Sequence, residues 1–263
     1  MITIDSSRIA FSIGRFDIGW YGIAIAVAVM VLILWVTHEV RRKGGISYDT
    51  VVNAALIGIP SGIVFARLMH VIDQWDYYVQ NPGQIIGGAG LSVWGAILGA
   101  TLGVWLYSRV SKSFQFGYLA DMLAPGIILA QAIGRVGCTL NGCCYGVPTG
   151  ALFGIRYTNT DSFAALDIPF QPTQIYEIIY NLIVFAILLK LRGKLRPDGS
   201  LFLVYLSFYS VWRFGIDYIR VGTPFLFGLH QAQVISLAVL AVTLPLLILR
   251  TRPMKPQAAA SLP

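Results

Sequence analysis

Residues 134–146 read GRVGCTLNGCCYG and stand where the polarity of the chain changes most sharply. A long apolar run precedes them, and the longest polar-containing segment follows. Arg135 is a permanent planar cation whose donors fit a phosphate or a carboxylate, and the four glycines permit tight turns close to a ligand. We expect a membrane helix to end near Arg135 and an anionic headgroup to bind there. The alternative is an arginine that snorkels to water beside glycines that only form turns.

The composition indicates an integral membrane protein. Hydrophobic residues make up 56% of the chain and charged residues only 12%, with a mean hydropathy of +0.70. Soluble domains carry about 25% charged residues. The formal net charge of +7 comes from short basic clusters between apolar runs, which is typical of membrane topology and does not indicate nucleic-acid binding.

Seven apolar runs are predicted to cross a membrane, each near the roughly 20 residues that a spanning helix needs. They cover residues 18–36, 51–72, 91–107, 118–136, 175–191, 201–219 and 232–249. Residues 1–17 should lie at the interface, and residues 138–173 predict a small extracytoplasmic cap with a short strand at 153–157. We therefore expect an all-α membrane protein, a seven-transmembrane-helix bundle, with one polytopic domain (residues 1–250) and a disordered tail (residues 251–263).

Basic residues are distributed unevenly between the two ends of these runs. Those at one end are Arg41, Arg42, Lys43, Arg109, Lys112, Lys190, Arg192, Lys194, Arg196, Arg250, Arg252 and Lys255. Those clearly at the other end are Arg8, Arg15, Arg156 and Arg220. By the positive-inside rule, the N-terminus and the cap should be outside and the C-terminus cytoplasmic.

Polar side chains of five predicted spans then fall at one depth, near the outer surface, and the inner half has almost none. Tyr209, Arg213, Asp217 and Arg220 form one helical stripe, which should face the bundle interior because a charge in lipid is costly. The other members of the group are Tyr21, Arg67, Arg135, Gln174 and Glu177. We expect Asp217 to pair with an arginine of the stripe. The surplus of cations favours an anionic ligand, for which a phospholipid phosphate is available; internal salt bridging is the alternative.

Three cysteines, Cys138, Cys143 and Cys144, lie close together in the chain. We expect them to be packed small residues, or to form at most one disulfide on an oxidising side. No histidine or carboxylate lies within a few residues to complete a metal site, so no metal is expected.

The stretch at 134–146 resembles the signature of the prolipoprotein diacylglyceryl transferase family, roughly Gly-Arg-x-Gly-Asn-x-x-Asn-Gly-Glu-x-x-Gly. The matching positions are Gly134, Arg135, Gly137, Asn141, Gly142 and Gly146. Cys138 replaces the usual asparagine, and Cys143 stands where glutamate is frequent. Other segments resemble family motifs in the same order: WYG at 20–22, AR at 66–67, PTQIYE at 172–177, the stripe of Tyr209, and Gln233 with Ser236.

One departure concerns the family motif Ser-x-His-Gly-Gly, whose histidine is considered important for activity. Residues 92–96 here read SVWGA, so Trp94 replaces that histidine and cannot accept a proton. His70, His230, Glu177 and Asp217 are the candidates to stand in for it, and the sequence does not choose among them.

The resemblance implies transfer of the diacylglyceryl group from phosphatidylglycerol to the thiol of the lipobox cysteine of a preprolipoprotein. A thioether forms and glycerol phosphate leaves, in the bacterial cytoplasmic membrane and without a metal or organic cofactor. The nucleophile must be a thiolate, and the leaving phosphate needs preorganised donors. The implied catalytic residues are Arg135, Arg213, Asp217 and Glu177. The implied substrate-binding residues are Arg135, Tyr21, Arg67, Asn141, Gly142, Gln174, Tyr209 and Arg220.

Two alternatives come from other functional classes. A non-catalytic phospholipid-binding relative would keep the headgroup site and lose activity, which Trp94 would explain. A redox protein would use the cysteines, although vicinal Cys143 and Cys144 bridge only with strain. A transporter would need polar groups through both leaflets, and no internal repeat is evident.

Overall fold

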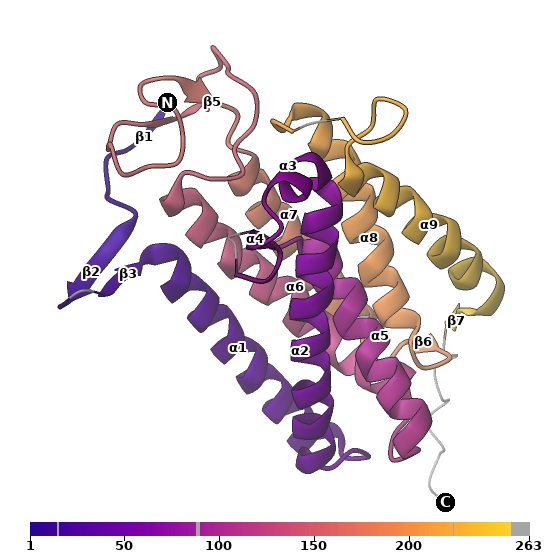
Figure 1. The fold of residues 1–263 in the computed structure, drawn as a ribbon. Coiled ribbons are helices and arrows are strands. Elements are labelled where there is room, and N and C mark those ends of the chain that lie inside the picture. Colours follow the sequence, from indigo (N-terminus) through magenta and orange to yellow (C-terminus); the bar gives the residue numbers. More distant parts are fainter. Residues whose placement is uncertain (15, 88–89, 223, 254–263) are drawn as a thin grey trace, which may run out of the picture.

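The structure, a computed structural model, describes residues 1–14, 16–87, 90–222 and 224–253, and it is mostly helical. Six of the described helices are long and apolar enough to cross a membrane, and they run side by side as a bundle (Figure 1). They are α1 (Trp20–Lys43), α2 (Tyr48–Asp73), α5 (Val93–Ser111), α6 (Phe116–Asn141), α7 (Thr173–Leu191) and α9 (Gln231–Arg250).

The predicted seventh span is shorter than expected. Helix α8 (Ser200–Ile216) has 17 residues and is followed by a 3-10 turn, η1 (Asp217–Ile219). At 1.5 Å per residue it is about 26 Å long, and it is not among the six described helices that length and composition support as spans. Helix α8 packs against α6, α7 and α9 and contributes Leu201, Phe202 and Tyr205 to the main apolar core.

Small residues let the helices approach closely in two pairs. A Cβ atom on Gly95 of α5 would lie 2.4 Å from the Phe65 carbonyl oxygen of α2. A Cβ atom on Gly137 of α6 would lie 2.7 Å from the Ala24 Cβ of α1. Glycine at such contacts lets the two helix backbones approach closely and make van der Waals contacts. These contacts are a main source of helix association in lipid.

The prediction that the fourth helix ends near Arg135 is wrong. Helix α6 continues through Gly137 to Asn141 and ends at Gly142, whose φ of 68° is left-handed. Gly137 serves the contact with α1 instead. The cap therefore begins one helical turn later than predicted.

The cap contains a three-stranded sheet to which the N-terminus contributes (Figure 1). Strand β1 (Ile2–Ile4) runs parallel to β4 (Ile155–Tyr157), and β4 pairs with β5 (Pro169–Phe170). Ile155, Tyr157 and Phe170 are buried in the small core of the cap. A hairpin of β2 (Ile9–Ile13) and β3 (Phe16–Gly19) leads into α1. The predicted strand at 153–157 is confirmed in its second half, whereas the pairing of residues 2–4 with it was not predicted.

Two short helices, α3 (Trp75–Gln80) and α4 (Gln84–Gly87), follow α2. At the opposite end of the bundle, β6 (Leu195–Arg196) pairs with β7 (Arg252–Pro253). The first residues of the predicted disordered tail are thus hydrogen-bonded, and residues 254–263 lie outside the described part of the chain.

That end is more polar than predicted. Glu39 of α1 is completely buried, and its carboxylate lies 2.8 Å from the Arg192 guanidinium. The carboxylate of Asp121 accepts hydrogen bonds of 2.8 Å from the backbone N–H groups of Gly199 and Phe202. Asp121 thereby satisfies free donors at the start of α8, as an N-cap residue does. These polar groups stabilise helix ends and contact protein atoms.

Candidate functional site

A cavity of about 300 Å³ lies at the cap end of the bundle, where α2, α5, α6, α8 and α9 meet. Its charged and titratable lining residues are His70, Asp73, Arg135, Cys144, Arg213, Asp217, Arg220 and His230. The structure thus brings together Arg135, Arg213, Asp217 and Arg220, which the sequence predicted to share one depth. Arg135 lies in α6 and Arg213 near the end of α8. Asp217 lies in η1, and Arg220 is the extended residue that follows η1.

Arg135 is held by a buried ion pair with Glu177 of α7. The Nε atom of Arg135 lies 2.9 Å from Oε1 of Glu177, and the two side chains are 10% and 2% exposed. A buried pair of this kind positions both groups, because removal of either partner leaves an uncompensated charge out of water. Glu177 therefore orients the Arg135 guanidinium at the cavity wall.

Arg213 and Asp217 form the second ion pair of the site, with 3.0 Å between Nη2 and Oδ1. The other Asp217 oxygen lies 3.5 Å from Nδ1 of His230, at the start of α9. The predicted pairing of Asp217 with an arginine of the stripe is confirmed, although α8 ends at Ile216 and the last part of the stripe is not α-helical.

The cavity lining is less cationic than the sequence suggested. Asp73, at the end of α2, adds a carboxylate that the sequence reasoning did not include. Among the described residues of the lining, the cationic groups without a full set of partners are two arginines. Within the described chain, Arg220 has no carboxylate within salt-bridge distance, and Nη1 of Arg213 is buried without a hydrogen-bond partner.

Trp94 lies on the cavity wall at the start of α5 and is only 2% exposed. Its ring packs edge-on against Tyr209, with 5.1 Å between ring centroids. The indole Nε1 is a second buried donor without a protein partner among the described residues. A buried donor without an acceptor costs about 1–3 kcal/mol, and Trp94 and Arg213, which both line the cavity, each carry one.

The turn after α6 forms another part of the wall. Gly142 favours glycine, since its φ is 68° and an added Cβ would lie 2.0 Å from Oγ of Ser162, which would have to move. Gln174 is buried and donates to the Cys143 carbonyl over 2.7 Å, and the Asn141 amide donates to the Cys143 sulfur over 3.7 Å. These three predicted binding residues shape the loop, and none of them lines the cavity.

Tyr157 of β4 supports the same turn from the cap. Its hydroxyl donates to the Thr139 carbonyl over 2.9 Å. Burial raises the pKa of Tyr157 above its ordinary value, so the hydroxyl keeps its proton and remains a donor. The cap sheet is thereby tied to the last turn of α6.

The remaining predicted binding residues lie around the cavity. Arg67 donates to the backbone carbonyls of Gln84, Ile85 and Gly90 and so anchors the segment after α3. Tyr209 is buried behind Trp94. Tyr21 is half-exposed on α1, and its Cα atom is 3.2 Å from the ideal Cβ position of Gly137. None of the three lines the cavity.

The structure also separates the four candidates for the missing histidine. Glu177 and Asp217 are each held in an ion pair with an arginine. His70 and His230 both line the cavity. The contributions of Asp73, Cys144 and the Trp94 indole were missed, because nothing in their local sequence indicates which way each side chain faces.

The family and the individual proteins that this chain resembles carry matching names. Residues 8–249 match the family described as prolipoprotein diacylglyceryl transferase. A protein of Dehalococcoides mccartyi named phosphatidylglycerol–prolipoprotein diacylglyceryl transferase is 51% identical over 255 residues, covering 97% of this chain and 98% of that protein. Proteins of the same name from Clostridioides difficile and Bacillus cereus are each 36% identical, over 88% and 93% of this chain and 90% and 92% of their own lengths.

Proposed function

The chain belongs to the prolipoprotein diacylglyceryl transferase family, and from that premise we propose that its cavity binds the phosphatidylglycerol headgroup and catalyses transfer to a preprolipoprotein. The diacylglyceryl group passes to the thiol of the lipobox cysteine, which gives a thioether and releases glycerol phosphate. The named relatives, with similarity over nearly the whole chain, support an active transferase over a non-catalytic lipid-binding protein.

The observation that carries the proposal is that two residues lining the cavity each carry an unused buried donor. Nη1 of Arg213 and Nε1 of Trp94 have no partner in the described chain, and both residues line the cavity. Arg220 and Arg135 lie on the same cavity. Donors that are fixed in place and kept from water stabilise a charge that develops during the reaction. A phosphate leaving with the electron pair of a C–O bond is such a charge.

The roles of the other predicted residues follow from their contacts. Glu177 holds Arg135, and Asp217 holds Arg213 beside His230. Asn141, Gly142 and Gln174 shape the turn after α6, while Tyr209 supports Trp94. Arg67 anchors the segment after α3, and Tyr21 packs α1 against α6. We assign the proton acceptor for the substrate thiol to a cavity histidine, His70 or His230, because the two candidate carboxylates, Glu177 and Asp217, are each paired with an arginine.

The protein functions as a multi-pass protein of the bacterial cytoplasmic membrane under this proposal. Helix α8 is the seventh span, since 17 residues lie at the short end of what can cross a bilayer. Residues 1–250 form one membrane domain with the cap and the N-terminus outside. The concentration of lysine and arginine at the other end supports this orientation, and the cavity then opens at the depth of the outer headgroups.

The function is tested with the full chain in phosphatidylglycerol vesicles and a lipobox peptide. We expect a peptide heavier by one diacylglyceryl group, detected by mass spectrometry, together with released glycerol phosphate. A matched peptide with serine in place of the lipobox cysteine should remain unmodified. Folded protein that binds phosphatidylglycerol without forming product would instead support the non-catalytic lipid-binding alternative.

The change Trp94→Phe tests the indole donor separately. Phenylalanine keeps an aromatic ring against Tyr209 but removes Nε1. A hydrogen bond to a charged group contributes about 1.5–3 kcal/mol, so we expect kcat/KM for phosphatidylglycerol to fall by about 10- to 100-fold with little change in thermal stability.

Trp212→Phe is the matched control. The Trp212 indole is also buried without a partner and stacks on Tyr180, but it does not line the cavity. Its kinetics should match those of the wild type. Equal effects of the two substitutions would rule out a specific role for the Trp94 donor.

A further inference from the structure

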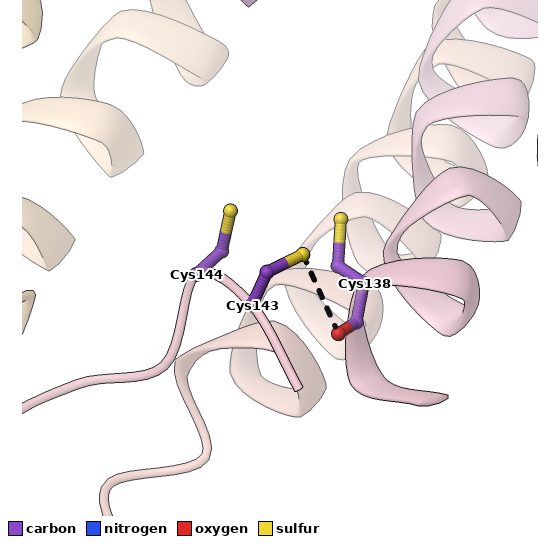
Figure 2. A group of neighbouring side chains, drawn as sticks. All are labelled: Cys138, Cys143 and Cys144. Carbon is purple, nitrogen blue, oxygen red and sulfur yellow. Dashed lines mark hydrogen bonds between the residues drawn. The ribbon is translucent and has the colours of Figure 1, made fainter. Parts of the chain in front are cut away.

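Three thiols converge beside the cavity. Cys138 lies in the last turn of α6, and Cys143 and Cys144 follow the end of the helix. Their sulfur atoms all lie within 4.8 Å of one another. Figure 2 shows Cys143 between the other two, with its sulfur turned toward Cys138. We call this group the thiol cluster.

The turn after α6 produces this convergence. The left-handed Gly142 reverses the chain, and the Cys143 N–H donates to the Cys138 carbonyl over 3.2 Å. Cys144 also has a positive φ, 64°, which is uncommon for a residue with a side chain. The local backbone thus directs sulfurs from both sides of the turn to one point.

The number and type of ligands match an open zinc site. Zinc–sulfur bonds of about 2.3 Å place tetrahedral thiolates about 3.8 Å apart, so the sulfurs need to approach by no more than about 1 Å. Among the described residues, no histidine or carboxylate joins the group. From the sequence, that lack argued against a metal. Three protein ligands with one open position are, however, the arrangement of zinc sites that bind a substrate.

The surroundings suit bound thiolates. Nη1 of Arg135 lies 3.8 Å from the Cys138 sulfur, and the Asn141 amide donates to the Cys143 sulfur. Donors to ligand atoms of this kind orient and tune a metal site.

We infer that Cys138, Cys143 and Cys144 bind a thiophilic d¹⁰ cation of the zinc class, whose open position accepts the thiol of the lipobox substrate. Cys144 connects the two sites because it belongs to the thiol cluster and also lines the cavity with Arg135 and Arg220. Soft sulfur ligands select such ions over Mg²⁺ or Ca²⁺. The inference rests on the proposed transferase activity for its second part only.

The chemistry balances without a redox step. When the substrate thiol binds the cation, its S–H bond breaks and the proton passes to a neutral imidazole, His70 or His230. The thiolate sulfur then forms a bond to the glycerol carbon of the lipid. The C–O bond to phosphate breaks, and its electron pair leaves with glycerol phosphate beside the cavity arginines. A metal-bound thiol is deprotonated at neutral pH, so no base is needed at position 94.

Metal binding is tested by titrating the reduced, full-length wild-type protein in detergent with Zn²⁺ and with Co²⁺. We expect one ion per chain and, for Co²⁺, a sulfur-to-metal charge-transfer band. Cys138→Ser, Cys143→Ser and Cys144→Ser should each weaken binding by about 100-fold or more, whereas His70→Ala should bind the ions like the wild type. A folded wild-type protein with three reactive thiols and no such band would overturn the inference.

The substrate role is tested on the cobalt-loaded protein. Adding the lipobox peptide should shift the charge-transfer band, and the serine peptide should not. Removing the metal with a chelator should slow thioether formation at least about tenfold, and Zn²⁺ should restore it. An unchanged spectrum with full activity after chelation would overturn the substrate role while leaving the transferase established. A shifted spectrum without any product would count against the proposed transferase and not against the metal site.

Discussion

Replacing Arg213 with alanine is expected to reduce the turnover number for thioether formation by about 10²- to 10³-fold, the usual loss for one preorganised donor to a developing anion. Arg213 lines the cavity, its Nη2 is fixed by Asp217, and its Nη1 is buried without a partner. The guanidinium is thus oriented before the substrate binds. The measurement is single-turnover transfer with saturating phosphatidylglycerol, which separates the chemical step from lipid binding.

Two further variants make this prediction specific. Arg213→Lys keeps the charge but not the planar donors, so we expect it to recover only a small part of the lost rate. Arg109→Ala removes an exposed arginine whose guanidinium stacks on Trp105 and which does not line the cavity. It should behave as the wild type. A rate for Arg213→Ala within about threefold of that control would contradict the proposed phosphate clamp, since the expected loss is at least 10²-fold.

Replacing Glu177 with alanine is expected to lower the free energy of unfolding by about 3–5 kcal/mol, because Arg135 would remain buried without its counter-charge. The two side chains are 2% and 10% exposed and 2.9 Å apart. The measurement is thermal or denaturant-induced unfolding in detergent, followed by circular dichroism. Transfer activity should fall as well, since Arg135 would lose its orientation at the cavity wall.

The double variant Arg135→Met, Glu177→Leu separates stability from catalysis. Apolar side chains of similar volume often replace a buried ion pair at no cost, so the double variant should regain most of the stability. Its activity should stay low, because the Arg135 guanidinium is then missing from the cavity wall. Recovery of both properties would show that the pair only stabilises the bundle.

Local pattern was sufficient for the membrane helices and for the grouping of their charges. An apolar run of suitable length predicts a membrane helix directly, because a helix forms its backbone hydrogen bonds in lipid without partners from distant residues. The spacing of Arg213, Asp217 and Arg220 indicated a common face, and the signature around Arg135 indicated the family. The length of α8 and the end of α6 were less well predicted, because a helix end depends on neighbouring packing, as at Gly137.

The sequence by itself thus determined a membrane helix bundle, the family, and the residues available at one end of that bundle. Only the tertiary structure decided how they are used: Glu177 with Arg135, Asp217 between Arg213 and His230, and Arg67 with backbone carbonyls. It also decided that Trp94 presents a free donor and that three sulfurs meet. The physical reason is that partner choice and side-chain direction arise from contacts between helices far apart in the chain, which no local periodicity encodes.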